Sequence, residues 1–214
     1  MLKLITISSI LFITSCSLPD KKQKDNLNSI STLDSNSFKS KIDSAYLTWL
    51  ENEILEGKIQ KICPEYGSEE FQAFLEKDYD NENRFSYSKI LKKLYADFNQ
   101  DGEIDALYVL EKQDCAQGNG YVGDLQRGVV IISEDNSYKV DNRIIDKLTA
   151  AINAKAVKQF FVNVAYIEIQ NVSNELIKGN YWDWVQGDPT GQPSLNKSFQ
   201  YNFIQDEISI SSIK

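Results

Sequence analysis

Histidine is absent from all 214 residues of this sequence. Serine-histidine and cysteine-histidine catalysis both need an imidazole to move a proton, so both are excluded. Zinc or iron sites with histidine ligands are excluded for the same reason. Two carboxylates could still form a glycosidase, but no pair of acidic residues stands out. We therefore predict no catalytic residue, and the sequence favours a protein that is not an enzyme while leaving that question open.

Positive charge is also scarce. The chain has 23 lysines and arginines against 31 aspartates and glutamates, a net charge of -8. Nucleic acids demand a basic surface, so no nucleic-acid partner is expected. The segment Gly118–Gly123 has the spacing G-x-G-x-x-G, but the residues after it favour a strand, whereas a dinucleotide motif needs a helix there. We interpret it as a turn and expect no nucleotide.

Long hydrophobic runs are missing, and one short run opens the chain. Lys3 precedes an apolar stretch from Leu4 to Thr14, which is the layout of a secretory leader. This run is about half of what a helix needs to cross a bilayer of roughly 30 Å. We expect residues 1–15 to be a signal peptide that is removed.

The leader ends in Ile13-Thr14-Ser15-Cys16, which resembles the lipobox of bacterial lipoproteins. The resemblance implies that the Cys16 thiol receives a lipid and that Cys16 becomes the new N-terminus. Several acyl chains hold a protein stably at a membrane. Ser17 is not the aspartate that implies retention at the inner membrane, so we expect an anchor in the outer membrane, facing the periplasm or the cell surface. The alternative is an ordinary secretory leader with an incidental cysteine.

Only two cysteines remain beside Cys16, namely Cys63 and Cys115. In an oxidising compartment an even remainder predicts one disulfide bond. Two buried free thiols are the alternative.

The remaining residues predict a polar tether and one folded domain. Residues 16–40 lack an apolar period and indicate the tether, whereas residues 41–214 are long enough for a single globular domain. Helices are expected at 38–54 and from Ser68, and 142–156 has helical composition. Strands are expected at 90–96, 104–111, 128–133, 138–140, 161–170, 175–184, 198–204 and 207–211. The predicted fold is α+β, with N-terminal helices followed by an antiparallel β-meander.

One nine-residue segment, Asp97–Asp105, carries recognisable chemistry. Its oxygen-bearing residues alternate, and Gly102 permits a sharp turn. Calcium prefers six to eight oxygen ligands. The segment resembles the calcium loops of FG-GAP repeats, and the resemblance implies Ca²⁺ as cofactor. The implied ligands are the side chains of Asp97, Asn99, Asp101 and Asp105 and the backbone carbonyl of Glu103. The alternative is a solvated acidic turn without metal.

Aromatic residues gather at Tyr181, Trp182 and Trp184. They would form either a binding surface or part of the core, and core packing is the more common role of such residues. Taken together, the sequence suggests an envelope-anchored, non-enzymatic binding module, such as an inhibitor or immunity protein with a protein partner in the envelope. A carboxylate-dependent hydrolase acting on envelope glycans is the alternative.

Overall fold

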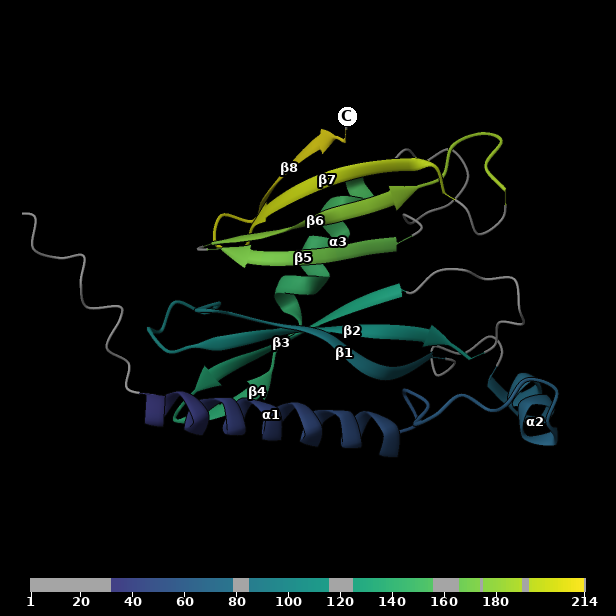
Figure 1. Ribbon diagram of the computed structural model, residues 1–214, viewed down its shortest axis with the longest axis horizontal. Helices are drawn as coiled ribbons and strands as arrows, with labels where there is room; N and C mark the ends of the chain where they lie inside the picture. Colours follow the sequence, from purple (N-terminus) through teal and green to yellow (C-terminus); the bar gives the residue numbers. More distant parts are fainter. Residues whose placement is uncertain are drawn as a thin grey trace, which may run out of the picture.

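A computed structural model describes residues 32–78, 85–115, 125–155, 166–173, 175–189 and 193–213. Within these ranges the chain forms three helices and eight strands (Figure 1). The helices are α1 (Thr32–Leu55), α2 (Glu69–Asp78) and α3 (Arg143–Lys155). Ser68 begins α2, because its side-chain Oγ accepts a hydrogen bond from the Phe71 N–H at 3.0 Å, as an N-cap residue does.

The first sheet, sheet A, contains four antiparallel strands in chain order. They are β1 (Phe85–Ala96), β2 (Asp105–Asp114), β3 (Leu125–Glu134) and β4 (Ser137–Val140). A two-residue turn joins β3 to β4, in which Asp135 and Asn136 have φ values of 50° and 63°. A two-residue turn with positive φ at both positions twists in the same sense as the strands it connects. β4 therefore becomes the last strand of sheet A.

The second sheet, sheet B, repeats this order with the remaining strands. They are β5 (Tyr166–Ser173), β6 (Leu176–Asp183), β7 (Leu195–Asn202) and β8 (Glu207–Ser212), again antiparallel and in chain order. Gly179 lies where β6 is crowded, since a Cβ there would be 2.8 Å from the Phe199 ring. Only glycine allows this close approach.

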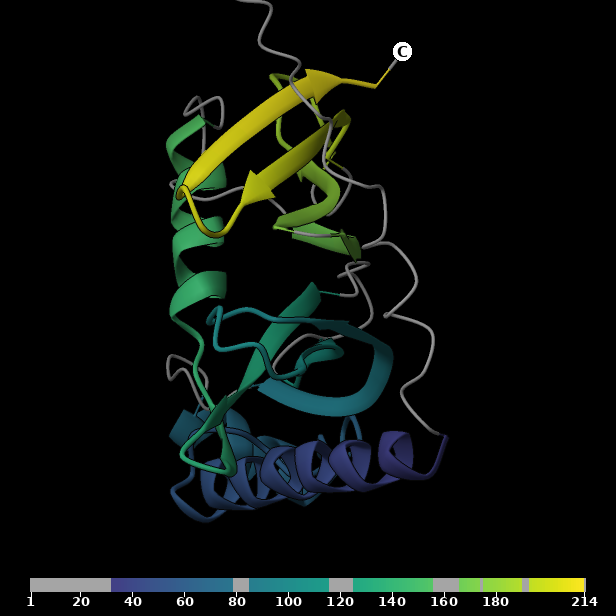
Figure 2. The ribbon, with the colours of Figure 1, turned by 90° about the vertical axis from the view of Figure 1, so that its left-hand side faces the viewer.

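Two hydrophobic clusters lie on opposite faces of sheet A. One face packs against α1, with Ile42 and Tyr46 of the helix over Tyr108, Leu110 and Ile131. The other face packs against α3 and one face of sheet B. Figures 1 and 2 show this arrangement, with α1 below sheet A, sheet B above it and α3 along one side.

Gly128 of β3 marks the point where sheet A, α3 and sheet B meet. A Cβ at this position would lie 2.7 Å from Cδ1 of Ile145 on α3 and 3.1 Å from Cδ1 of Ile169 on β5. The absence of a side chain at Gly128 therefore lets both elements approach sheet A.

The predicted layout of helices followed by one meander is wrong. The strands form two separate four-stranded sheets, and α3 stands between them in the chain. Residue periodicity locates strands but does not specify which strands pair. Here β5 packs across sheet A, where Ile169 joins the shared core, and does not pair with β4.

The first helix also starts earlier than expected. α1 begins at Thr32, so the last residues of the predicted 16–40 tether belong to the helix. The segment before Phe38 has few apolar residues, and helical periodicity cannot be detected without them.

Candidate functional site

The Asp97–Asp105 loop joins β1 to β2, and its side chains bind the loop's own backbone. Asp97 accepts hydrogen bonds from the Asp101 N–H at 3.1 Å and the Gly102 N–H at 2.9 Å. Asp101 accepts one from the Glu103 N–H at 2.8 Å. Gln100 and Gly102 both have positive φ, 62° and 89°. The acidic side chains therefore stabilise a tight turn that the backbone would not otherwise favour.

Asn99 and Ser133 connect the loop to the neighbouring hairpin. Asn99 Nδ2 donates to the Ser133 carbonyl at 2.8 Å and to Asp101 Oδ2 at 2.9 Å. Ser133 Oγ also donates to Asp101 Oδ2. The hydrogen bonds that Asp101 accepts from Ser133, from the Glu103 N–H and from Asn99, in that order, lower the pKa of Asp101.

Asp105 is fully buried at the start of β2. Its Oδ1 accepts from the Ser133 N–H at 2.7 Å, and its Oδ2 accepts from the N–H groups of Phe98 at 2.7 Å and Asn99 at 3.3 Å. Burial raises the pKa of Asp105 to about 6, although the three N–H donors act in the opposite direction. Asp105 therefore fixes both ends of the loop to β3.

The donor set of the loop fits calcium, since every predicted ligand is an oxygen atom. In the ranges that the structure describes, no three histidine, cysteine, aspartate or glutamate side chains are grouped in a way that could hold a metal ion. The loop oxygens are instead directed at N–H groups of the loop and of β3. The calcium site stays a prediction.

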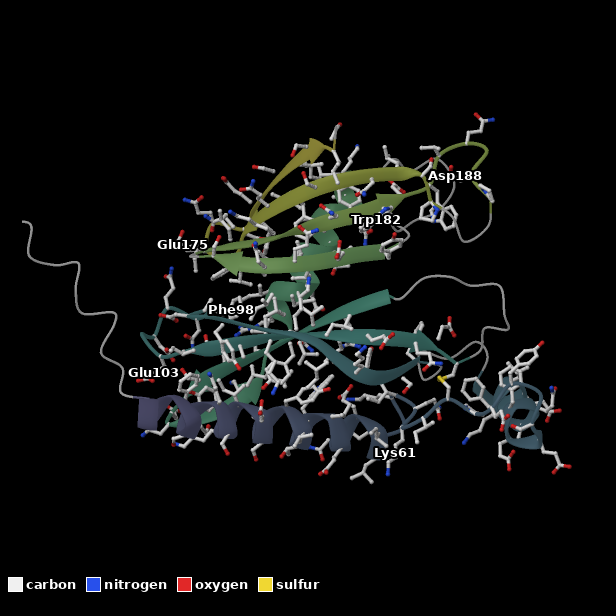
Figure 3. All side chains as sticks on the ribbon, viewed as in Figure 1. Lys61, Phe98, Glu103, Glu175, Trp182 and Asp188 are labelled. Atoms are coloured by element: carbon white, nitrogen blue, oxygen red, sulfur yellow. A yellow bond between two sulfur atoms is a disulfide. The ribbon has the colours of Figure 1, made fainter. Side chains whose placement is uncertain are left out.

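Cys63 and Cys115 form a disulfide bond with a Cα–Cα distance of 4.9 Å, which confirms the predicted pair. The bond joins the segment after α1 to the end of β2 (Figure 3).

The three aromatic residues of the predicted surface do not share one face. Tyr181 is fully buried in the core between the two sheets. Trp182 lies on the opposite face of β6 and stacks on Tyr166 of β5, with ring centroids 4.3 Å apart (Figure 3). Trp184 follows the end of β6 and is half-buried. A surface made of all three residues is therefore not present, and Tyr181 belongs to the core.

Several sequence predictions fall wholly or partly outside the described residues. They are the signal peptide at 1–15, the lipid-modified Cys16 with its lipobox, most of the tether at 16–40, the turn at Gly118–Gly123 and the first half of the strand expected at 161–170. No helix in the described part of the chain is long and apolar enough to cross a membrane.

The structure adds one feature that sequence reasoning missed, a groove of about 580 Å³ between α1 and β4. One wall is a stripe of α1 that runs from Lys41 to Asn52, and the other is the turn and strand of residues 136–140. We call it the α1–β4 groove. Figures 1 and 2 both place β4 directly beside α1. The sequence signal for it is faint, because polar and small residues on one side of a helix usually indicate only a solvated face.

The electrostatics of the α1–β4 groove differ from those of the whole chain. Lys41 and Lys139 line it, and no carboxylate does. Trp49 and Tyr138 supply aromatic surface, and both side chains are half-buried. A smaller groove of about 370 Å³ shares Lys41 and Tyr138 and continues to the loop at Gly102 and Glu103.

A third groove, of about 460 Å³, lies on the opposite side of α1. Leu47, Leu50 and Ile54 of the helix and Tyr87 of β1 make it mainly apolar. Of the three grooves, the α1–β4 groove has no carboxylate, and the other two have one each, Glu103 and Glu51. None of these grooves therefore brings two carboxylates together as a glycosidase requires.

No protein-family model, no curated protein and no solved structure matches this chain.

Proposed function

We propose that this protein is a non-enzymatic binding module, held at the outer membrane by a lipid on Cys16, that engages a protein partner in the envelope. An inhibitor or immunity protein is a concrete form of this function. The observation that supports it is the character of the three grooves beside α1, which offer amide, lysine and aromatic side chains without a carboxylate pair.

Cross-linking in the envelope and an assay of glycan turnover distinguish this proposal from its alternative. The full chain should become cross-linked to an envelope protein and should release no reducing ends from purified envelope glycan. Glycan turnover that disappears on substitution of aspartates or glutamates would contradict the proposal and would favour the hydrolase.

The lipid anchor has its own test, since Cys16 is the residue that the lipobox resemblance identifies. We expect a tagged fatty acid to label the parent protein in cells and to leave Cys16→Ala unlabelled. Cys63→Ala is the matched control, because it removes a cysteine that is bonded in the fold, and it should still be labelled. Equal labelling of Cys16→Ala and the parent would refute lipid attachment at Cys16.

The calcium loop is proposed as a structural site, with Asp97, Asn99, Asp101, Asp105 and the Glu103 carbonyl as ligands. Calcium at about a hundred times its dissociation constant would stabilise the fold by roughly 2.7 kcal/mol. For a domain of this size that raises the melting temperature by about 5 to 11 °C. Thermal unfolding in calcium and in chelator measures the difference.

Matched variants separate calcium binding from the loop's own hydrogen bonds. The double variant Asp97→Ala, Asp101→Ala should unfold at a lower temperature in chelator and should show no calcium-dependent rise. The pair Glu51→Ala, Glu76→Ala, which removes two exposed carboxylates from helices, should keep the full rise. A melting temperature of the parent that calcium does not change would leave the segment an acidic turn.

A further inference from the structure

We propose that the α1–β4 groove binds an extended, acidic peptide segment of a partner protein, which adds to sheet A as a strand beside β4. This inference rests on the proposed binding function and names its partner's chemistry. The partner segment would pair with the outer edge of β4 and lie against α1.

Two residues of β4 direct their backbone N–H and C=O groups away from β3, where an added strand could pair with them. Residues in an antiparallel pair alternate between those that bond to the partner strand and those whose N–H and C=O point away. Glu134 and Ser137 close the two-residue turn, and the Asp141 N–H donates to the Val130 carbonyl at 2.9 Å. This alternation turns the N–H and C=O groups of Tyr138 and Val140 away from β3.

Both of these residues line the groove. β4 is the last strand of sheet A, and no further strand pairs with it in the part of the chain that the structure describes. Unpaired edge groups of this kind are the template on which extended peptides bind by strand addition. β4 is only four residues long, which limits pairing to a short segment and gives protection against indiscriminate aggregation.

α1 provides the second wall and so gives the groove a selective shape. Ser44, Ala45 and Thr48 are small side chains on the stripe that faces the groove, and they leave room beside the strand edge. Trp49 is half-buried at the same wall. Successive side chains of an extended peptide point in opposite directions, so one set would lie on the helix wall and the other would face solvent.

Charge indicates the class of peptide. Lys41 and Lys139 are the charged residues of the groove, in a chain whose net charge is -8. Lys139 forms an ion pair with Glu134 at the exposed rim, and such an exposed pair contributes little and exchanges readily. Acidic side chains placed near Lys41 and Lys139 therefore find complementary charge.

Binding of defined peptides to the full chain tests the proposal. The probe is a capped, fluorescent octapeptide of alternating aspartate and valine, and its lysine-valine counterpart is the charge control. We expect the acidic peptide to bind with a dissociation constant below about 1 mM, and the basic peptide at least about tenfold more weakly. Two further peptides carry N-methyl groups on either the aspartate or the valine nitrogens, so that each blocks one edge of the strand. One of them should lose binding.

Variants of the protein locate the site. Lys41→Glu reverses an exposed charge in the groove and should weaken binding of the acidic peptide at least about tenfold. Lys155→Glu, an exposed position at the end of α3, is the matched control and should leave binding unchanged. Both variants should unfold at the temperature of the parent, which excludes a loss of fold as the cause.

Several results would overturn the proposal. They are no binding of the acidic peptide at millimolar concentration, equal binding to Lys41→Glu, or equal binding of both N-methylated peptides. A different experiment, cross-linking in the envelope, distinguishes failure of this inference from failure of the proposed function. If an envelope partner is cross-linked equally to the parent and to Lys41→Glu, the chain is a binding module that uses another surface.

Discussion

Strands β2 and β6 differ in how many of their faces are covered. From Asp105 to Leu110 every residue of β2 is buried, because α1 covers one face of sheet A and sheet B with α3 covers the other. In β6 burial alternates from residue to residue over its whole length. Figures 1 and 2 both show α3 on one side of sheet B. A strand that is buried on both faces is a continuous apolar run, and one that is buried on a single face alternates.

The outer face of sheet B, which no other element covers in the described part of the chain, carries polar side chains. Lys178 and Asn180 of β6 and Ser198 and Gln200 of β7 are cross-strand partners on that face. The inner-face partners are Ile177 with Tyr201 and Gly179 with Phe199. From Ala106 to Val109, β2 and its partners in β3 are buried on both faces, so the burial of one of these faces depends on α1 remaining in place.

The largest expected effects on stability come from substitutions in β2, one on each of its two buried faces. Leu107 packs toward sheet B and Leu110 toward α1, and neither is accessible to solvent. Leu107→Ala and Leu110→Ala should each lower the free energy of unfolding by about 2 to 5 kcal/mol, because each leaves a cavity. Denaturant unfolding of the two variants measures this. A cost below about 1 kcal/mol at Leu110 would mean that α1 does not seal that face.

Truncation to alanine at two neighbouring positions of β6 should give one large and one small loss in the free energy of unfolding. Ile177 is fully buried on the inner face, whereas its neighbour Leu176 lies on the outer face and is partly exposed. Ile177→Ala should cost about 2 to 4 kcal/mol, and Leu176→Ala about 1 kcal/mol or less. The contrast is read from the same unfolding curves. Equal costs at Leu176 and Ile177 would show that the outer face of sheet B is covered as well.

The smallest effect concerns the contact between α1 and sheet A. Asp43 of α1 accepts hydrogen bonds from Tyr108 of β2 and, at 2.6 Å, from Lys93 of β1. Burial raises the pKa of Asp43, but these hydrogen bonds and the charge of Lys93 outweigh it, and the net pKa falls below its ordinary 3.8. A lowered pKa in the folded state stabilises the fold above pH 3.8, and this stabilisation is lost as the pH falls through the folded-state value.

Asp43→Asn should therefore cost about 1 kcal/mol or less at neutral pH, since the pair is partly exposed. The difference from the parent should shrink as the pH falls below about 4. Unfolding of both proteins at several pH values measures this difference directly. The raised pKa of Asp105 makes stability depend on pH in the opposite direction. Because Asp105 is present in both proteins, its contribution cancels from the difference. A difference that stays constant from pH 7 to 3 would assign the effect of Asp43 to packing alone.

Local chemistry was predictable wherever the signal lies in neighbouring residues. The N-cap at Ser68, the turn with Gly102 and the eight strand segments follow from hydrogen-bonding side chains, glycine freedom and β-branched or aromatic runs. The Cys63–Cys115 bond was predictable for a different reason, because only one pairing was possible once Cys16 was set aside. The assignment of Tyr181 to the core depends on which way β6 faces, and periodicity alone does not give that direction.

The amino-acid sequence by itself determined the strand segments, the helices apart from the first residues of α1, the disulfide and the acidic turn, since each depends on local conformational preference or on a single available partner. Tertiary structure decided that the strands divide into two sheets, that α1 covers one face of sheet A and that β4 is the last strand of that sheet, beside α1. Those features arise from contacts between distant residues, such as Gly128 with Ile145 and Ile169. The burial of apolar faces drives such contacts, and it is non-directional and does not specify which segments meet.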